Sequence, residues 1–407
     1  MLDVLNAFVY RDETANGGDD GCNGPLAGMT VGVKANIAVK DMPFHAGIGA
    51  WENRRADADA QVITLLREAG AAIVGIVNME EGALGAKTDN PHFGPTQNPH
   101  HLGYSPGGSS GGSGAAVAAG FCDFALGTDT MGSVRIPAAH CGIYGFKPAT
   151  KNISQAGLEP ADLSLDAIGA MARNLELLQR ACETISDIGD APLPGNGAIL
   201  TEHGVDVKPD VAQVFERALG ALDRAPAKTR LSYPQSRIRF AGFIQISTQM
   251  AAHLRDVAVS GHLAKLLNYG PKRSSTGLTE DRGVLTITRD EVRDLVAKHG
   301  FLIMPTVPNP PFPHSQAEPA DQADFTCLAN IAGLPALSIP AGWTDTDLPI
   351  GIQLVGPIGC EQGLFALTRQ LDSKLEAYRP PVKPYSCLLY TSPSPRDQRG
   401  SRMPSSA

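Results

Sequence analysis

Short apolar runs alternate with segments of helical spacing along the chain, a pattern typical of α/β proteins. Thr30 to Val39 alternates between apolar and other residues, which predicts a strand that carries Lys34 at its end. The apolar residues of the segment from Asp57 to Gly70 fall on one helical face, which predicts a helix with Asp57 or Asp59 as the N-cap. Ala71 to Val77 is apolar almost throughout and predicts a buried strand. A helix, a short loop and an apolar strand in this order predict an α/β layer.

The same spacing rules extend this pattern to the rest of the chain. Helices are predicted at 78–87, 170–186, 209–224, 245–267, 289–299 and 360–371. Strands are predicted at 124–127, 301–304 and 350–355. We therefore expect an α/β fold with a mixed, largely parallel central sheet and helices on both faces. Residues 1–385 form one domain in this interpretation, whereas 386–407 is rich in Ser, Pro and Arg and is interpreted as a non-native or disordered tail.

The stretch from Ser105 to Pro148 stands out from this pattern, because two glycine-rich turns flank a helix and a strand. A glycine-serine loop, Gly107 to Gly114, runs directly into a small-residue helix, Ala115 to Gly120, and a short apolar strand follows. A second polar turn comes after that strand. The first turn contains Ser109 and the second contains Ser133. Glycine keeps such turns open and lets backbone N–H groups point at a bound anion, so we expect a reactive site here.

Composition and charge exclude several classes of function. The 407 residues are 43% hydrophobic and carry a net charge of −8, without a Lys/Arg cluster, which argues against a nucleic-acid surface. The longest apolar stretch, Ala69 to Val77, is far shorter than a membrane span, and the N-terminus does not resemble a signal peptide. Seven scattered cysteines without a CxxC pair indicate reduced thiols. We therefore expect a cytoplasmic protein that binds neither nucleic acid nor membrane.

Three separated motifs resemble the amidase signature family of serine hydrolases. They are GVKAN at 32–36, GGSSGGS from Gly107, and GTDTMGSVRIPAAHCG from Gly127, which leads to GFKP. The resemblance extends over about Leu5 to Pro384. It implies a Ser-cisSer-Lys triad, with Ser133 as the nucleophile, Ser109 after a cis peptide bond and Lys34 as the base. It also implies hydrolysis of a carbon–nitrogen bond without a metal or an organic cofactor, and a helical arm before Leu5 that this sequence lacks.

Each triad position also has a plainer structural explanation. A free serine hydroxyl is a weak nucleophile at neutral pH, so Ser133 needs a base, and a lysine can serve if burial lowers its pKa. Judged by position alone, Lys34 would be a surface lysine, but the two serine turns favour the catalytic interpretation. Ser109, Ser110 and Ser113 could simply stabilise a loop or cap a helix. We keep that explanation for Ser110 and Ser113 and assign proton transfer to Ser109.

The resemblance further implies an oxyanion hole formed by the backbone N–H groups of Thr130, Met131, Gly132 and Ser133. Many family members have glycine where Met131 stands, so this side chain either lines the acyl pocket or joins the core, and the sequence favours neither. Asp129 and Arg135 are expected to form a buried pair that supports the turn.

An alternative arises from three overlapping G-x-S-x-G matches, centred on Ser105, Ser109 and Ser110, which suggest an α/β-hydrolase with a histidine base. Pro106 lacks the N–H that such a nucleophile turn requires, and no strand is predicted before the other two matches. None of the ten histidines falls in a metal motif, and no lysine follows the glycines as in a phosphate-binding loop. This alternative is therefore weaker.

The sequence predicts an amidase that hydrolyses the amide bond of a small molecule through a serine acyl-enzyme. Two alternatives stay open: a glutamine-hydrolysing, amidotransferase-type subunit of a complex, and an inert scaffold that retains the fold. The choice of amide is open because pocket walls come from loops that the sequence does not place. A homodimer is the default assembly.

Overall fold

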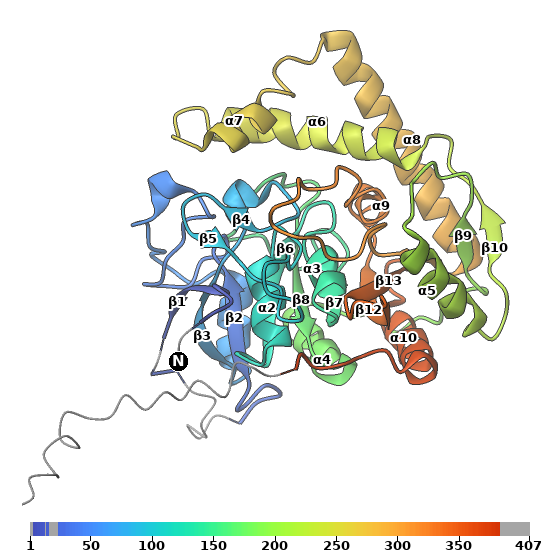
Figure 1. Cartoon of the computed structure of the whole chain (residues 1–407), viewed down its shortest axis with the longest axis horizontal. Coiled ribbons are helices and arrows are strands. Elements are labelled where there is room, and N and C mark those ends of the chain that lie inside the picture. Colours follow the sequence, from blue (N-terminus) through green and yellow to red (C-terminus); the bar gives the residue numbers. More distant parts are fainter. Residues whose placement is uncertain (1–2, 13, 16–22, 383–407) are drawn as a thin grey trace, which may run out of the picture.

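The computed structural model describes residues 3–12, 14–15 and 23–382. Their centre is one eleven-stranded sheet (Figure 1). Its strands are β1 (Phe8–Arg11), β2 (Thr30–Lys34), β3 (Ala72–Val77), β6 (Phe124–Asp129), β7 (Tyr144–Lys147), β8 (Ala167–Ala172), β9 (Ala198–Leu200), β10 (Ala227–Thr229), β11 (Leu302–Pro305), β12 (Ala336–Trp343) and β13 (Pro349–Val355). A separate pair consists of β4 (Asp89–Asn90) and β5 (Gly94–Pro95).

The strands follow the order β1-β3-β2-β6-β8-β7-β12-β13-β11-β9-β10. Pairing is parallel within β3-β2-β6 and within β11-β9-β10. It is antiparallel from β6 through β8, β7, β12 and β13 to β11, and also between β1 and β3. The predicted mixed α/β sheet is confirmed, but its four parallel pairs are confined to two groups and are outnumbered by six antiparallel pairs, so the sheet is less parallel than expected.

Ten α-helices surround the sheet in the described part of the chain. They are α1 (Gln61–Glu68), α2 (Gly111–Ala118), α3 (Arg135–His140), α4 (Leu175–Ile185), α5 (Pro209–Gly220), α6 (Gln235–His253), α7 (Gly261–Leu267), α8 (Ser275–His299), α9 (Cys327–Ala332) and α10 (Glu361–Leu375). Single 3-10 turns lie at Gly49–Trp51 and Glu81–Ala83.

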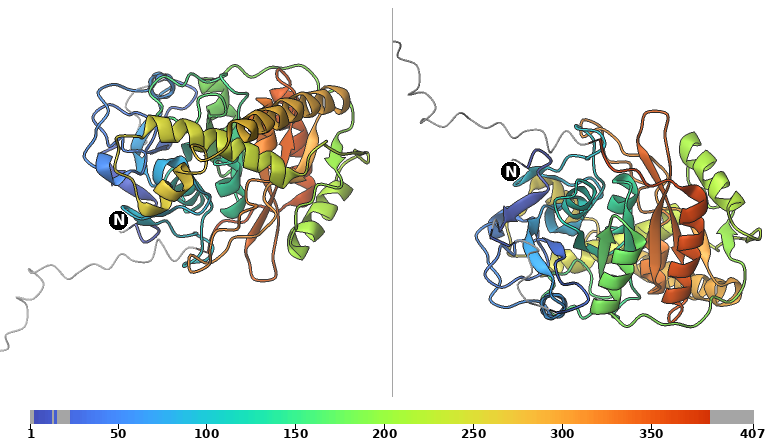
Figure 2. Two further views of the ribbon diagram at one scale, coloured as in Figure 1. Left: turned by 90° about the horizontal axis from the view of Figure 1, so that it is seen from above. Right: turned by 90° about the horizontal axis from the view of Figure 1, so that it is seen from below.

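Alternate residues of β6 show how the helices divide between the two faces. Phe124 and Leu126 pack into a core with α1, α4, α5 and α10, whereas Ala125 packs into a second core with α2 and α3. Since neighbouring side chains of a strand point to opposite faces, the sheet is covered on both sides, as predicted. Helices α6, α7, α8 and α9 form a third core. Seen from above, α6 and α8 run across the molecule (Figure 2).

Several predicted elements differ from the structure. The helix predicted at 78–87 is wrong, because Gly82, Ala83 and Gly85 all have positive φ angles and leave only a 3-10 turn. The helix predicted at 170–186 begins only at Leu175, and its first residues belong to the buried strand β8. The small apolar residues of β8 fit both the strand period of two and the helical period of 3.6, so the sequence pattern does not separate β8 from the helix α4 that follows.

Other helix boundaries differ as well. Helix α1 starts after Ala60 and has no side-chain cap, while Asp59 instead accepts hydrogen bonds from the Lys40 N–H and from Arg67. The segment 245–267 holds the end of α6 and all of α7 rather than one helix. The predicted tail at 386–407 lies outside the described residues.

Candidate active site

Lys34 lies at the end of β2 and is completely buried. Its Nζ donates hydrogen bonds to Ser109 Oγ at 2.7 Å and to Thr128 Oγ1 at 2.8 Å. Burial disfavours the ammonium form and lowers the pKa of Lys34 to about 7, although nearby carboxylates, above all Asp166, oppose the shift. A lysine in this state can accept a proton near neutral pH. Sequence reasoning missed Thr128, which lies inside the third motif.

Ser109 stands in the glycine-serine turn directly before α2, and the Gly108–Ser109 peptide bond is cis. Its backbone oxygen accepts the N–H of Glu80 at 3.0 Å, and the next N–H, that of Ser110, donates to the carbonyl of Ser133 at 3.2 Å. The backbone therefore links the two predicted serine turns directly.

Ser110 and Ser113 serve the structure, as the sequence indicated. The Ser110 hydroxyl donates to the carbonyl of Thr128, and the Ser113 hydroxyl donates to that of Leu126. Both contacts tie the start of α2 to β6, and both serines are buried. Ser110 precedes α2 but makes no side-chain capping bond, so capping is not its role.

Ser133 occupies the second turn, between β6 and α3, and is 8% exposed toward a pocket. In the described part of the chain, no hydrogen bond engages its hydroxyl. The N–H of Gly132 donates to Asp129 Oδ1 at 2.7 Å, so one of the four predicted oxyanion donors is already engaged. Thr130, Met131 and Ser133 remain as candidate donors.

The turn is supported by the buried pair of Asp129 and Arg135, whose charged atoms lie 2.9 Å apart. Arg135 also donates to the side-chain oxygens of Gln353 and Asn330, each at 2.7 Å. Burial alone would raise the pKa of Asp129, but the Arg135 guanidinium lowers it to about 2. The carboxylate is therefore charged and fixed, which holds the residues around Ser133 in place.

Three further buried ionisable groups surround these turns, and the sequence analysis did not identify them. Burial raises the pKa of Asp166 to about 7, and Thr130 Oγ1 donates to this carboxyl at 2.6 Å. Burial and the neighbouring Glu318 raise the pKa of Glu80 to about 8. Burial lowers the pKa of Lys147, in the GFKP motif, to about 7. Such shifts concentrate at functional sites, and these depend on contacts between distant segments.

Ser133 opens into a pocket of about 420 Å³ whose walls are mainly apolar. Thr130 and Met131 line it beside Ser133, and helix α6 contributes Phe240 and Phe243. A methyl group added at Gly242 of α6 would lie 3.3 Å from the Met131 sulfur, so this side chain extends from the turn to the helix. Met131 therefore lines the pocket and also packs against the core formed by α6, α7, α8 and α9, so it occupies both of the expected positions.

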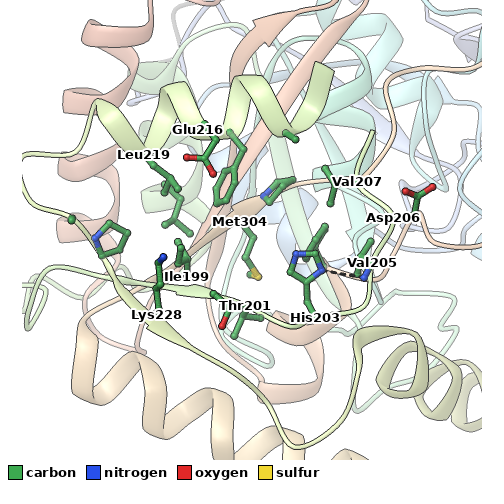
Figure 3. Close-up of a pocket in the computed structure, with 18 residues that line it drawn as sticks. Ile199, Thr201, His203, Val205, Asp206, Val207, Glu216, Leu219, Lys228 and Met304 are labelled. Atoms are coloured by element: carbon green, nitrogen blue, oxygen red, sulfur yellow. Dashed lines mark hydrogen bonds between the residues drawn. The ribbon is translucent and has the colours of Figure 1, made fainter. Parts of the chain in front are cut away.

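A larger hollow of about 720 Å³ lies between α5 and strands β9, β10 and β11 (Figure 3). Ile199, Leu219 and Met304 line it together with the charged Glu216 and Lys228. It contains none of the predicted site residues, so size alone does not identify the reactive site.

Other kinds of site find little support in the described residues. Across residues 3–12, 14–15 and 23–382, no group of three or more His, Cys, Asp or Glu side chains is arranged to hold a metal ion. The five cysteines described are free and buried. No described helix is both long and apolar enough to cross a membrane.

Comparison with known proteins gives consistent matches. The amidase family model matches residues 10–365. The A subunit of the glutamyl-tRNA(Gln) amidotransferase of Methanothermobacter thermautotrophicus is 33% identical over 393 residues, covering 86% of this chain and 85% of that protein. The corresponding protein of Treponema pallidum is 32% identical, with 88% and 84% covered.

Solved structures agree with these matches. The A subunit of the glutamyl-tRNA(Gln) amidotransferase from Thermotoga maritima superimposes with a TM-score of 0.75 at 28% identity, covering 88% of this chain and 86% of that one. A crystal structure described as an amidase gives 0.82 at 26% identity, with 91% and 92% covered. A chain of a vestigial protein complex linked to the origins of an s-triazine catabolic enzyme gives 0.83 at 26% identity, with 92% of both chains covered.

Proposed function

The chain belongs to the amidase family, and from that premise we propose that it hydrolyses the carbon–nitrogen bond of a small-molecule amide through an acyl-enzyme on Ser133. The observation that carries this proposal is the 2.7 Å hydrogen bond between the fully buried Lys34 Nζ and Ser109 Oγ. Backbone contacts join the Ser109 turn to the Ser133 turn, and Ser133 faces the pocket. These contacts support the proposal that Ser133, Ser109 and Lys34 act together as nucleophile, relay and base.

The reaction proceeds in two halves. Ser133 Oγ attacks the amide carbonyl carbon, and its proton passes through Ser109 to neutral Lys34. The backbone N–H groups of Thr130, Met131 and Ser133 stabilise the oxyanion. The carbon–nitrogen bond breaks, and the leaving amine takes the proton from Lys34. Water then attacks the acyl carbon, its proton returns along the same route, and the acid leaves as Ser133 regains its hydroxyl.

Covalent labelling tests this proposal. A fluorophosphonate loses fluoride to an activated serine and leaves a phosphonyl adduct that intact mass detects. We expect one adduct on the wild type, none on Ser133→Ala and slowed labelling of Lys34→Ala. Ser110→Ala controls for loss of a hydroxyl in the same motif and should still label. A folded wild type that remains unlabelled would contradict the proposal and favour the inert scaffold.

We propose as a second candidate a glutamine-hydrolysing subunit of a complex, which the comparisons favour over a small-molecule amidase because the relatives of 33% and 32% identity are A subunits of glutamyl-tRNA(Gln) amidotransferases. If this candidate is right, the purified chain should release ammonia from glutamine in a reaction that Ser133→Ala abolishes. A stable partner protein should also co-purify from the source cells and stimulate that release. Turnover of other amides without turnover of glutamine would exclude it.

A further inference from the structure

The pocket above Ser133 takes its walls from two distant parts of the chain. Met131 and Ile136 belong to the segment that carries Ser133, whereas Phe240, Phe243 and Ile246 belong to α6. These three α6 residues are spaced three apart and therefore lie along one side of the helix. Tyr269, just beyond α7, completes the apolar wall.

Aromatic faces dominate the α6 side of this pocket. The rings of Phe243 and Tyr269 meet edge to face, with centroids 5.4 Å apart. Phe243 is only partly buried and Tyr269 is 53% exposed, so both rings keep apolar surface free for a ligand. Offset or edge-to-face packing of a further ring on such surfaces is favourable.

The polar groups of the pocket do not match a charged acyl group. Arg239 is the one basic residue among those described in the lining, and its guanidinium is already bound to Asp324. Glu318 is acidic and accepts the N–H of Ala86 at 3.0 Å. A ligand carboxylate would lose its water here without gaining an unpaired cation, which is costly.

A neutral polar partner is present instead. Gln322 lines the pocket and is 2% exposed, and within the described part of the chain neither end of its side-chain amide has a hydrogen-bond partner. A buried amide left unpaired destabilises a protein, and a neutral polar group of a ligand could satisfy it. The volume of about 420 Å³ also suffices, because a cavity of about 150 Å³ already admits benzene.

We propose that the acyl group of the substrate is neutral and aromatic, that it stacks against Phe243 in this pocket, and that Phe243 determines specificity. The inference rests on the proposed amide hydrolysis at Ser133. A neutral aromatic acyl group would distinguish this chain from a glutamine hydrolase, because glutamine would bring a carboxylate and an ammonium group into the pocket next to Ser133.

The test compares kcat/KM for 3-phenylpropionamide, acetamide and glutamine. In the wild type we expect the aromatic amide to exceed both others by about tenfold or more, as burial of a ring predicts. In Phe243→Ala the ratio of the aromatic amide to acetamide should fall by about fivefold or more, mainly through KM. Phe215→Ala is the matched control, because Phe215 is also partly buried but lines the separate hollow beside α5. The control should keep the wild-type ratio.

Other outcomes distinguish an error in the acyl-group specificity from an error in the proposed amide hydrolysis. Ser133-dependent turnover that favours acetamide or glutamine over the aromatic amide would overturn this inference and leave the proposed function standing. An unchanged ratio in Phe243→Ala would remove Phe243 as the specificity determinant. Failure to hydrolyse any amide, together with failure to label with fluorophosphonate, would overturn the proposed function itself.

Discussion

The charge state of a single buried lysine controls the proposed chemistry. Lys34 can accept a proton only when neutral, and its pKa is about 7. We therefore predict that kcat/KM rises with pH through about 7 and then levels off. Thr128→Val removes an acceptor that stabilises the ammonium form, so the rise should move to lower pH. A pH–rate profile of both proteins checks this, and a rise that stays in place would exclude Thr128 as a positioning residue.

The same lysine should make stability depend on pH. Its folded pKa of about 7 lies below the ordinary value of 10.5, so the unfolded chain binds more protons between these values. Stability due to this group is therefore lowest below about pH 7 and is regained as pH rises toward 10.5, by up to about 5 kcal/mol. Lys34→Met cannot titrate, so its unfolding free energy relative to wild type should decline between about pH 7 and 10.

Urea unfolding of both proteins at several pH values measures this difference. Lys147 titrates in the same range but is present in both proteins and cancels. A difference in unfolding free energy that is independent of pH would mean that the fold does not lower the pKa of Lys34.

The buried pair below the nucleophile offers a third test. Arg135→Met leaves the Asp129 carboxylate buried without its partner, which should destabilise the protein by about 3–5 kcal/mol. Adding Asp129→Asn should recover part of that loss. Arg230→Met removes one partner of an exposed pair with Glu202 and should change stability little. Denaturant unfolding compares the variants, and equal effects at Arg135 and Arg230 would contradict this account.

Some residues of the candidate site can be predicted from the sequence, and others cannot. Lys34, Ser109 and Ser133 could be proposed from the sequence because each lies in a local motif that resembles the amidase signature family. Asp166 and Glu80 could not, since their influence arises only when the segments around β8 and residue 80 fold toward Lys34. The engagement of the Gly132 N–H by Asp129 likewise depends on the detailed turn geometry.

At the scale of elements, replacing glycine by alanine should have opposite effects on stability in helices α2 and α8. Helix α2 begins with Gly111 and Gly112, and a methyl group at Gly112 would lie 2.3 Å from the carbonyl oxygen of Asn78. Gly283 of α8 has open space around the same position. We predict that Gly112→Ala destabilises the protein by about 2 kcal/mol or more through this clash. Gly283→Ala should stabilise it by about 1 kcal/mol through helix propensity.

Thermal and denaturant unfolding measure both changes. Destabilisation by Gly283→Ala, or tolerance of Gly112→Ala, would show that these positions are not governed by propensity and close packing as argued. The glycines of α2 also explain why the sequence pattern places the helix start late, at Ala115. Helix propensity disfavours glycine, but the close approach to residue 78 requires it.

Elements whose apolar residues follow a single period, either that of a strand or that of a helix, can be predicted from the sequence. Strand β3 and helix α5 are examples, because the apolar residues of each follow one clear spacing. The segment 78–87 has helix-forming residues, yet the side chains of Asn78 and Glu80 accept hydrogen bonds from the backbone N–H groups of Met79 and Lys87, which favours a loop. Local propensity cannot reveal such bonds in advance.

At the scale of the whole molecule, the family match and the apolar pattern both end before the last residues. The amidase family model stops at residue 365, and the last helix of the described residues ends at Leu375. We predict that a chain ending at Tyr385 unfolds at the same denaturant midpoint as the full chain and labels with fluorophosphonate at the same rate. Loss of either property would show that 386–407 contributes to the fold or the site. Residues 386–407 lie outside the part that the structure describes.

The pocket itself shows what only the assembled molecule can reveal. Ser133 and Phe243 are separated by more than one hundred residues, and the sequence contains no motif that links them. The groups proposed to break the bond lie on the sheet and its turns, between Lys34 and Ser133, whereas the aromatic wall lies on α6 and just after α7. In this proposal, reaction and substrate choice reside on separate segments, which meet at the pocket and also touch where the Ser260 N–H donates to Glu81. Evolution, or an engineer who grafts another version of residues 235–270, could retarget this hydrolase while leaving its reactive groups untouched.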